Sequence, residues 1–281
     1  MLKIAVPNKG ALAEAAALML TEAGYRQRRT SKDLVCLDPD NEVEFFYLRP
    51  RDIAIYVGEG TLDVGITGRD LLLDSGAHAV ENMTLGFGAS TFRFAGPAGR
   101  LSSIDQLQGL RIATSYEGIV GAYLDERGIT ADVVRLDGAV ESSIRLGVAD
   151  AIADVVETGS TLRQADLEVF GEPILSSEAV MITRRDAPEP DGFAVFKRRL
   201  DSVIVARTYI MMDYDISSDH VEKAVEMTPG IESPTVSPLH RDGWVAVRSM
   251  VPRDAAQKIM DELYELGARG ILVTDILACR I

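Results

Sequence analysis

Short apolar runs alternate with segments of helical periodicity from the first residues onward, and this alternation constrains the fold more than any other feature. Ile4–Val6 is typical of a buried strand, and the Ala- and Leu-rich run Ala11–Ala23 is typical of a helix that ends at Gly24. The same exchange continues to Ala151–Val155. Repeated βα units predict parallel sheets covered by helices, with ligands bound beyond the carboxyl ends of the strands. Further helices are expected at Asp52–Val57, Ser102–Gln108, Gly118–Glu126 and Ala139–Leu146.

The expected elements divide into two α/β lobes, and the chain crosses between these lobes more than once. Two segments rich in glycine and alanine, 86–90 and 95–99, are typical of a hinge, and Ala179–Thr183 is expected to be the strand that leads back. A cleft between two such lobes can enclose a small ligand. The assignment is residues 1–90 and 179–205 for lobe I, and residues 91–178 for lobe II.

The last quarter of the sequence has a different order of elements. It follows a linker at 186–192, which holds two prolines, one glycine and three acidic residues, and a helix that begins at Phe193. The apolar pattern then predicts βαββαβ, the ferredoxin-like order, with its first strand beginning at Ala206. Residues 206–281 are therefore expected to form a separate domain, with an antiparallel sheet and helices on one face. A small domain of this kind is suited to binding an effector or a partner.

Charge and composition exclude several classes of function. The 281 residues carry a formal net charge of −14, and no run of Lys or Arg could follow a phosphate backbone, so nucleic acid is not an expected partner. No stretch of about 18 apolar residues is present and none has the pattern of a signal peptide, so a cytoplasmic protein without a membrane partner is expected. The cysteines and histidines lack metal-ligand spacing and no nucleophile motif occurs, so neither a built-in metal site nor covalent catalysis is expected.

The segment Ala151–Leu162 has the most specific pattern in the chain. An apolar strand ends in Asp154, and a short turn with hydroxyl side chains precedes a helical run. Backbone N–H groups, hydroxyls and a helix N-terminus would meet there, which suits a phosphate monoester, and Asp154 is placed to accept hydrogen bonds from sugar hydroxyls. A turn with a capping residue explains the same pattern, and the turn alone does not decide between the two. The turn residues are Glu157, Thr158, Gly159, Ser160 and Thr161.

Charged side chains recur where the expected strands of lobe I end. In a chain with excess negative charge, cations gathered at one edge of a sheet would bind an anionic metabolite. Each of them, taken singly, could also be an ordinary exposed charge. Glu141 follows an expected strand of lobe II. It is either an ordinary acid in the first turn of a helix, where the helix dipole favours negative charge, or a residue that closes the same cleft from lobe II. The lobe I residues are Lys9, Arg49, Arg51, Arg69 and Asp70.

Several segments match one known family in order along essentially the whole chain. The most specific is Glu-Thr-Gly-Ser-Thr-Leu, which ends at Leu162. The others are Val6–Gly10, Phe46–Pro50, Asp63–Asp70, Leu136–Glu141 and Thr228–Leu239. With these segments the sequence resembles the long form of the ATP phosphoribosyltransferase family, which opens histidine biosynthesis. The resemblance implies a two-lobed catalytic part like that of periplasmic binding proteins, with parallel and mixed sheets, and a C-terminal ferredoxin-like regulatory domain.

The resemblance also implies a reaction and a set of site residues. The reaction is transfer of the 5-phosphoribosyl group from phosphoribosyl pyrophosphate to N1 of ATP, with Mg²⁺ and release of pyrophosphate. By the match, Asp154 would hold the ribose hydroxyls, and Thr158, Gly159, Ser160 and Thr161 would hold the 5-phosphate. Glu157, which precedes them, is expected to be a further substrate-binding residue. Arg49 would neutralise the leaving pyrophosphate. The other residues expected to line the cleft or to handle nucleotide and pyrophosphate oxygens are Lys9, Arg51, Arg69, Asp70 and Glu141.

The C-terminal domain resembles the histidine-sensing domain of the same family, so free histidine is expected to inhibit. Gly270 stands where related sequences often have Ala, which removes one methyl group from the effector site. A homo-oligomer, either a dimer or a hexamer, is implied as well. The positions that match the effector site are Asp215, Ile231, Ser233, Thr235 and Gly270.

Two other classes of function fit parts of the same pattern. Solute-binding proteins also have a two-lobed α/β cleft and bind without turnover, but they are usually exported, and this sequence shows no signal segment. An amino-acid-responsive regulatory protein would use the C-terminal domain as its sensor and the lobes to bind another protein, which leaves the phosphate turn without a role. Turnover of ATP with phosphoribosyl pyrophosphate, with and without histidine, discriminates among the three.

Overall fold

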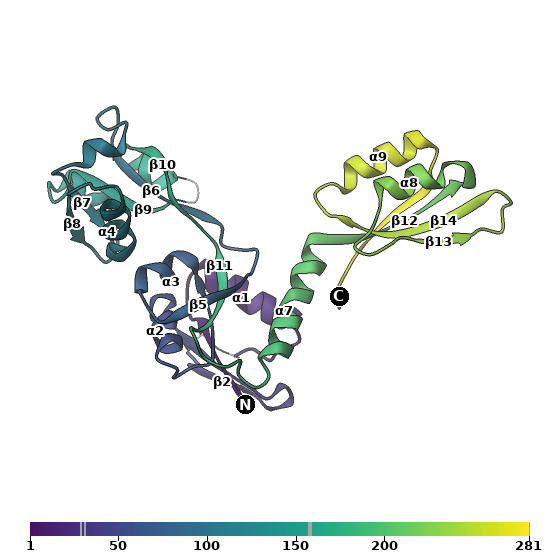
Figure 1. Cartoon of the computed structure of the whole chain (residues 1–281), viewed down its shortest axis with the longest axis horizontal. Helices are drawn as coiled ribbons and strands as arrows, with labels where there is room; N and C mark the ends of the chain where they lie inside the picture. Colours follow the sequence, from purple (N-terminus) through teal and green to yellow (C-terminus); the bar gives the residue numbers. More distant parts are fainter. Residues whose placement is uncertain (29, 31, 157–158, 281) are drawn as a thin grey trace. The chain divides into compact units, whose positions relative to one another are not determined.

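The computed structural model describes residues 1–28, 30, 32–156 and 159–280. The chain divides into two compact units (Figure 1), the first formed by Met1–Thr21 and Tyr25–Phe193 and the second by Glu22–Gly24 and the chain from Ala194 onward. The first unit contains two sheets and the second contains one. Among the described residues, no helix is both long enough and apolar enough to span a membrane.

Lobe I is built on a mixed six-stranded sheet with the order β2-β3-β1-β4-β11-β5. β1 pairs in parallel with both β3 and β4, while β11, which returns from lobe II, is antiparallel to β4 and β5. α2 packs closely on this sheet: a Cβ at Gly65 would lie 2.6 Å from Cγ2 of Ile53, so only glycine fits there. The elements are β1 (Leu2–Pro7), α1 (Ala11–Glu22), β2 (Val35–Asp38), β3 (Val43–Leu48), α2 (Pro50–Gly58), β4 (Val64–Gly68), α3 (Arg69–Ser75), β5 (Ala79–Thr84) and β11 (Ala179–Arg184).

Lobe II is a five-stranded sheet with the order β10-β6-β9-β7-β8. β7 is parallel to β8 and β9, and β6 is antiparallel to β9 and β10. Side chains alternate along β9, so Ala151 and Ala153 join the core on one face and Ile152 joins the core on the other. The elements are β6 (Ser90–Pro97), β7 (Arg111–Thr114), α4 (Glu117–Glu126), β8 (Asp132–Arg135), α5 (Ser142–Arg145), β9 (Ala151–Val156), α6 (Ser160–Gln164) and β10 (Leu167–Ser177).

The chain crosses between the lobes twice, as predicted. It leaves lobe I after β5 and returns from β10 to β11, and Ser90 at the start of β6 pairs with Ser177 at the end of β10. The hinge segment 86–90 was predicted correctly, since Gly86 and Gly88 have φ of 70° and 68° ahead of β6. The second expected hinge segment, 95–99, was wrong, because its first three residues are the end of β6 and pair with β10.

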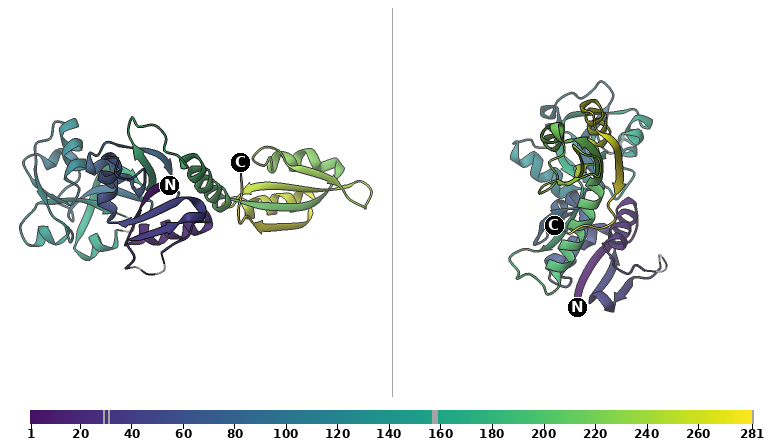
Figure 2. Two further views of the ribbon diagram at one scale, coloured as in Figure 1. Left: turned by 90° about the horizontal axis from the view of Figure 1, so that it is seen from below. Right: turned by 90° about the vertical axis from the view of Figure 1, so that its right-hand side faces the viewer.

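The second unit carries an antiparallel four-stranded sheet with the order β13-β14-β12-β15, which confirms the ferredoxin-like prediction. α8 and α9 lie on the same side of this sheet (Figure 1), and Met212 and Tyr214 of β12 are buried in the core between them. α7 is one uninterrupted helix, and β12 follows it directly (Figure 2). The elements are α7 (Phe193–Thr208), β12 (Tyr209–Ser217), α8 (Val221–Met227), β13 (Thr235–Pro238), β14 (Trp244–Pro252), α9 (Ala256–Leu266) and β15 (Arg269–Asp275).

Three predicted boundaries were wrong for local reasons. The helix expected over Ala139–Leu146 is reduced to α5, because Gly138 and Ala139 have φ of 115° and 47°, which a helix does not allow. The helix expected at Ser102–Gln108 is a single 3₁₀ turn, capped by Ser103 with Gln106. The strand expected from Ala206 begins three residues later, because α7 continues to Thr208.

Candidate functional site

Two predicted cations lie free at the carboxyl edge of the lobe I sheet. β1 and β3 are parallel and in register up to Pro7 and Leu48, so Lys9 and Arg49 follow at the same edge. Both side chains are exposed, and neither forms an ion pair with another residue that the structure describes. Because each is free to move toward an anion, both remain suited to the binding role that sequence predicts for them.

A further cation at this edge was not found by sequence reasoning. Arg28 stacks on the ring of Tyr47, with its Cζ 4.2 Å from the ring centroid, and its Nη2 donates to the carbonyl oxygen of Asn8 at 2.9 Å. Asn8 itself follows β1, and its side-chain Oδ1 is buried without a hydrogen-bond partner among the described residues. The segment around Arg28 carries no strand or helix signal, so only its position in the fold indicates a role.

Arg51 lies where lobe I meets lobe II. Its Nη1 donates to the carbonyl oxygen of Ser115 at 2.8 Å and lies 3.3 Å from Oδ2 of Asp74. Its Cζ lies 4.3 Å from the centroid of the Tyr116 ring, which is a cation–π contact. Oδ1 of Asp74 accepts the backbone N–H groups of Gly118 at 2.9 Å and of Ile119, so it caps α4 from the other lobe. Arg51 and Asp74 therefore link the two lobes beside the cleft.

Replacing Asp74 should weaken this link measurably. Asp74→Ala is expected to lower the free energy of unfolding by about 1–2 kcal/mol, as the loss of a helix N-cap does. In a unit of this size each kcal/mol lowers Tm by about 2–4 °C. Asp74→Asn keeps an acceptor oxygen and should lose less, and Asp125→Asn, at an exposed position of α4, is the control. A Tm of Asp74→Ala equal to that of the control would show that the cap contributes nothing.

Asp70 is buried at the strand that returns from lobe II. Its Oδ1 accepts the hydroxyl of Ser177 at 2.8 Å, and its backbone N–H donates to the same hydroxyl oxygen at 3.0 Å. Burial raises the pKa of Tyr116, and the nearby Asp70 carboxylate raises it further. The phenol therefore stays protonated at neutral pH and can donate a hydrogen bond. Asp70, predicted as a cleft residue, thus lies next to the Arg51 contact.

Asp154 faces the same cluster from lobe II. Burial is the main cause that raises its pKa, and the charges of Glu141 and Asp70 raise it further, while the N–H of Val155 and the charge of Arg51 lower it. The fold therefore brings three other predicted residues into electrostatic range of Asp154: Arg51, Asp70 and Glu141. Acceptors and a cation at one point suit a polar, charged ligand such as a sugar phosphate.

The turn after β9 is described from Gly159 onward. Glu157 and Thr158 lie outside the described residues, so their predicted roles stay predictions. Gly159 has a φ of 67°, a conformation that favours glycine, and it lines a pocket of about 540 Å³ on lobe II. Ser160 and Thr161 are exposed at the start of α6.

Arg69 is engaged elsewhere. Its Nε and Nη2 donate to the two carboxylate oxygens of Glu81, each at 2.8 Å, and Nη2 also lies 3.4 Å from Oε1 of Glu178. These two carboxylates raise the pKa of the guanidinium further. The prediction placed Arg69 with the cleft cations, but in this structure it holds the segment that joins β10 to β11.

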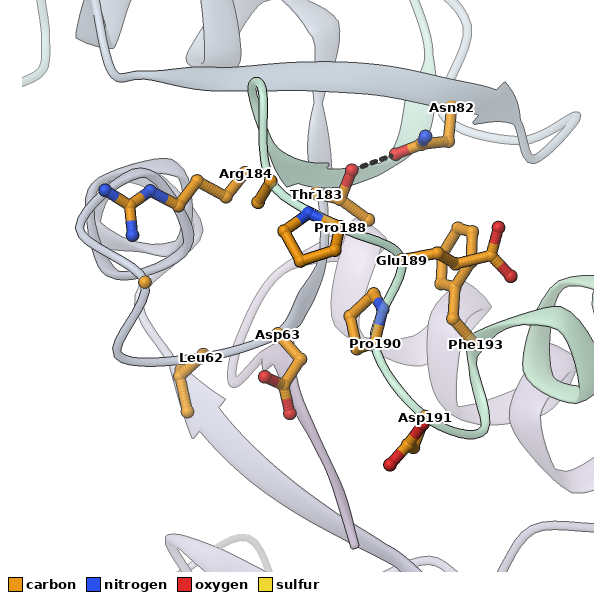
Figure 3. A pocket seen from close by; sticks show the side chains of 12 residues that line it. Leu62, Asp63, Asn82, Thr183, Arg184, Pro188, Glu189, Pro190, Asp191 and Phe193 are labelled. Carbon is orange, nitrogen blue, oxygen red and sulfur yellow. Dashed lines mark hydrogen bonds between the residues drawn. The ribbon is translucent and has the colours of Figure 1, made fainter.

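The pocket in Figure 3 lies at the opposite edge of lobe I. Asp63, just before β4, lines this pocket of about 580 Å³ together with Arg184 at the end of the antiparallel β11. Oδ2 of Asp63 already accepts a hydrogen bond from the backbone N–H of Lys3 at 2.8 Å. The hydroxyl of Thr183 donates to the side-chain oxygen of Asn82, also at 2.8 Å. This edge carries the amino ends of the parallel strands, so the pocket is separate from the site at the strand ends.

The predicted effector residues form two groups on the second unit. Ile231, Ser233 and Thr235 line one pocket of about 410 Å³ beside β13 and β14. Asp215 instead faces Gly270, where an added Cβ would lie 3.6 Å from Asp215 Oδ2. The chain as described therefore brings three of the five residues into one pocket and pairs the other two.

No group of three or more His, Cys, Asp and Glu side chains is arranged to hold a metal ion within the described parts of the chain. The carboxylates of Asp70, Glu141 and Asp154 belong to the cluster at the strand ends. These carboxylates could provide one or two contacts to a cation that enters the site bound to a ligand.

Comparison with known proteins decides the family. Residues 49–204 match the family model described as ATP phosphoribosyltransferase, and residues 206–278 match the model of the HisG C-terminal domain. An ATP phosphoribosyltransferase of Kocuria rhizophila is 67% identical over 281 residues, which covers 100% of both chains. The chain belongs to the ATP phosphoribosyltransferase family. A second family member, from Streptomyces coelicolor, is 66% identical over 286 residues, again with 100% of both chains covered.

A solved structure supports the same family assignment. It is described as the ATP phosphoribosyl transferase (HisG:HisZ) complex from Thermotoga maritima, with 28% identity and a TM-score of 0.64. The match covers 73% of this chain and 98% of that one. The first family model includes Arg49, Arg51, Asp70 and Asp154, and the second includes the pocket residues Ile231 to Thr235. The cluster of Arg51, Asp70, Glu141 and Asp154 and the pocket beside β13 thus lie within the matched parts of this ATP phosphoribosyltransferase family member, whereas Lys9 and Arg28 precede them.

Proposed function

We propose that this chain transfers the 5-phosphoribosyl group of phosphoribosyl pyrophosphate to N1 of ATP and releases pyrophosphate. The observation that carries the proposal is the 67% identity to an ATP phosphoribosyltransferase over the full length of both chains. The cluster of Arg51, Asp70, Glu141 and Asp154 at the strand ends supports it independently, because it offers both acceptors for sugar hydroxyls and a cation.

The reaction needs positioning and charge stabilisation rather than a protein nucleophile. A bond forms between N1 and C1′ while the bond from C1′ to pyrophosphate breaks, and positive charge develops on C1′ and the ring oxygen. Asp154 would accept hydrogen bonds from the ribose hydroxyls. Thr158, Gly159, Ser160 and Thr161 would hold the 5-phosphate, and Glu157 would be a further substrate-binding residue. Glu141 and Asp70 would line the cleft.

The leaving group is assigned to the cations of lobe I. Arg49 and Lys9 would neutralise pyrophosphate, because both are exposed at the sheet edge and unpaired within the described chain. Arg51 would contact the nucleotide from the lobe boundary. Mg²⁺ would enter bound to phosphoribosyl pyrophosphate and withdraw charge from the departing oxygens. Arg69 is assigned to hold the segment between the lobes, because its guanidinium is already paired with Glu81.

A direct assay tests the reaction. The protein is mixed with ATP, phosphoribosyl pyrophosphate and Mg²⁺, and the ultraviolet change of N1-substituted adenine is followed. Omission of each component in turn, and addition of EDTA, should abolish the signal. Binding of either substrate without an absorbance change would contradict the proposed reaction and favour a binding protein.

Regulation by histidine is the second part of the proposal. The effector site would combine the pocket residues Ile231, Ser233 and Thr235 with the Asp215 and Gly270 pair. A carboxylate suits the ammonium group of an amino acid, and hydroxyls suit its carboxylate. We also propose a homo-oligomer, a dimer or a hexamer, because the effector residues within one chain do not close around a single pocket.

Asp215→Asn is expected to remove most of this regulation. Loss of one charge-assisted contact of about 1.5–3 kcal/mol should raise the histidine concentration for half inhibition at least tenfold. Turnover is measured against histidine concentration for both proteins, with Asp219→Asn as the exposed control on the same domain. Equal inhibition of the variant and the wild type would remove Asp215 from the effector site.

A further inference from the structure

The pocket beside Gly159 carries positive charge that the site described so far does not use. Arg93 on β6 lies directly opposite Asp154 on β9, and Thr91 lies opposite Val156, so these side chains leave the same face of the sheet. Thr91, Arg93, Val156 and Gly159 all line the pocket of about 540 Å³. The pocket is therefore next to the turn that is proposed to hold a phosphate.

The Arg93 guanidinium is fixed on one side and unsatisfied on another. Its Nη2 donates to the carbonyl oxygen of Gly171 at 2.7 Å, which anchors the group against β10. Its Nε is buried and has no hydrogen-bond partner in the described structure. A buried donor without a partner is destabilising, so the group gains from any acceptor that enters beside it.

Arg163 places a second guanidinium at the same turn. Its Nη1 lies 3.7 Å from the position that a Cβ on Gly159 would occupy. Among the described residues that line this pocket, Glu168 is the one carboxylate, and its Oε2 accepts the backbone N–H of Gly99 at 3.2 Å. The described part of the lining thus carries two positive charges against one negative charge.

A phosphate monoester at this turn needs such charge. It carries about −1.5 to −2 at neutral pH, whereas the hydroxyls and N–H groups of Gly159, Ser160 and Thr161 are neutral. The carboxylates of Asp154 and Glu141 lie on the adjacent strand end and helix start, and the whole chain has a net charge of −14. Neutral donors alone would have to hold a dianion against this negative field.

We propose that Arg93, with Arg163 beside it, is the cationic part of the 5-phosphate site. The inference rests on the proposed function and adds two residues to it, both from lobe II. The half-buried Arg93, anchored to Gly171, supplies fixed charge, and the exposed Arg163 supplies mobile charge at the same pocket. The ligand recognised is the phosphate monoester of a ribose 5-phosphate group.

The test compares Arg93→Gln, Arg93→Lys and Arg163→Gln with the control Arg127→Gln, which removes an exposed arginine of lobe II next to Tyr123. KM values for each substrate are measured, and binding of ribose 5-phosphate and of ribose is followed by calorimetry. Arg93→Gln should raise KM for phosphoribosyl pyrophosphate at least tenfold and weaken ribose 5-phosphate equally, with KM for ATP changed less than twofold. Arg163→Gln should have a smaller effect in the same direction.

Two comparisons separate binding from a structural role. If Arg93 only held β10 through Gly171, its loss would lower Tm and change both KM values alike, and Arg93→Lys would not recover phosphate binding. Unchanged ribose 5-phosphate binding in both glutamine variants, with normal wild-type turnover, would overturn the inference and leave the proposed function intact. Arg93-dependent binding of ribose 5-phosphate without any turnover of ATP would instead contradict the proposed function and keep the phosphate site.

Discussion

Asp154→Asn is expected to lower kcat/KM for phosphoribosyl pyrophosphate by at least about 100-fold. Each hydrogen bond from a ribose hydroxyl to a charged carboxylate contributes about 1.5–3 kcal/mol, and the amide keeps neither the charge nor both acceptor oxygens. The measurement is steady-state turnover at saturating ATP. Asp132→Asn, an exposed position on β8 of the same sheet, is the matched control and should retain full activity.

The same variant should be more stable than the wild type at neutral pH. Burial raises the pKa of Asp154 above the ordinary value of an aspartate, so the folded state disfavours the ionised form. The resulting penalty is absent at low pH, develops as the pH rises from the unfolded pKa through the folded pKa, and is complete above both. Asp154→Asn should therefore raise Tm at pH 7 and leave it unchanged under strongly acid conditions.

The raised pKa also sets the acid limb of the wild-type activity. Because the charged carboxylate is the form that accepts from the ribose hydroxyls, kcat/KM should fall at a higher pH than an ordinary aspartate would give. A variant that loses activity and also loses Tm at pH 7 would contradict this account, since the residue would then be structural.

Arg49→Ala is expected to lower kcat by about 10²- to 10³-fold, the range seen when one donor to a developing oxyanion is removed. Tm should change little, because the side chain is exposed and makes no ion pair within the described chain. Arg49→Lys should recover part of the loss. Lys3→Ala removes an exposed cation at the other end of β1 and serves as the control. Turnover of Arg49→Ala at the wild-type rate would exclude this residue from the mechanism.

Much of the fold follows from local patterns, and its exceptions have a common cause. The alternation of β and α patterns predicted both lobes, and the order βαββαβ in the sequence predicted the second unit. Both predictions succeeded because the elements in these parts of the chain have a clear apolar face. β6 was read in part as a hinge because Gly96 interrupts it, although a Cβ there would lie 2.8 Å from Leu101. Close packing of this kind depends on the partner residue, which local composition does not contain.

The site divides in the same way. Lys9 and Arg49 were placed correctly after the ends of β1 and β3, since parallel strands bring their carboxyl ends to one edge. Asp154 lies two residues before the end of β9, where the predicted strand was too short. Arg69 pairs with Glu81, 12 residues away, and also contacts Glu178, 109 residues away, and both contacts depend on how β5 and β11 come together. Asp74 was missed for the same reason, because the backbone groups that it caps belong to the other lobe. Partners that meet only through the tertiary fold leave no spacing signal in one sequence.

The pairing of Ser90 with Ser177 has a topological consequence. Both ends of lobe II lie on neighbouring strands at one point, so the whole of residues 90–177 is an insertion between two strands of lobe I. A short loop could therefore close this segment into an independent chain, and β5 and β11, which are already hydrogen-bonded neighbours, could be rejoined without it. The chain thus keeps the architecture of two small domains, one nested within the other.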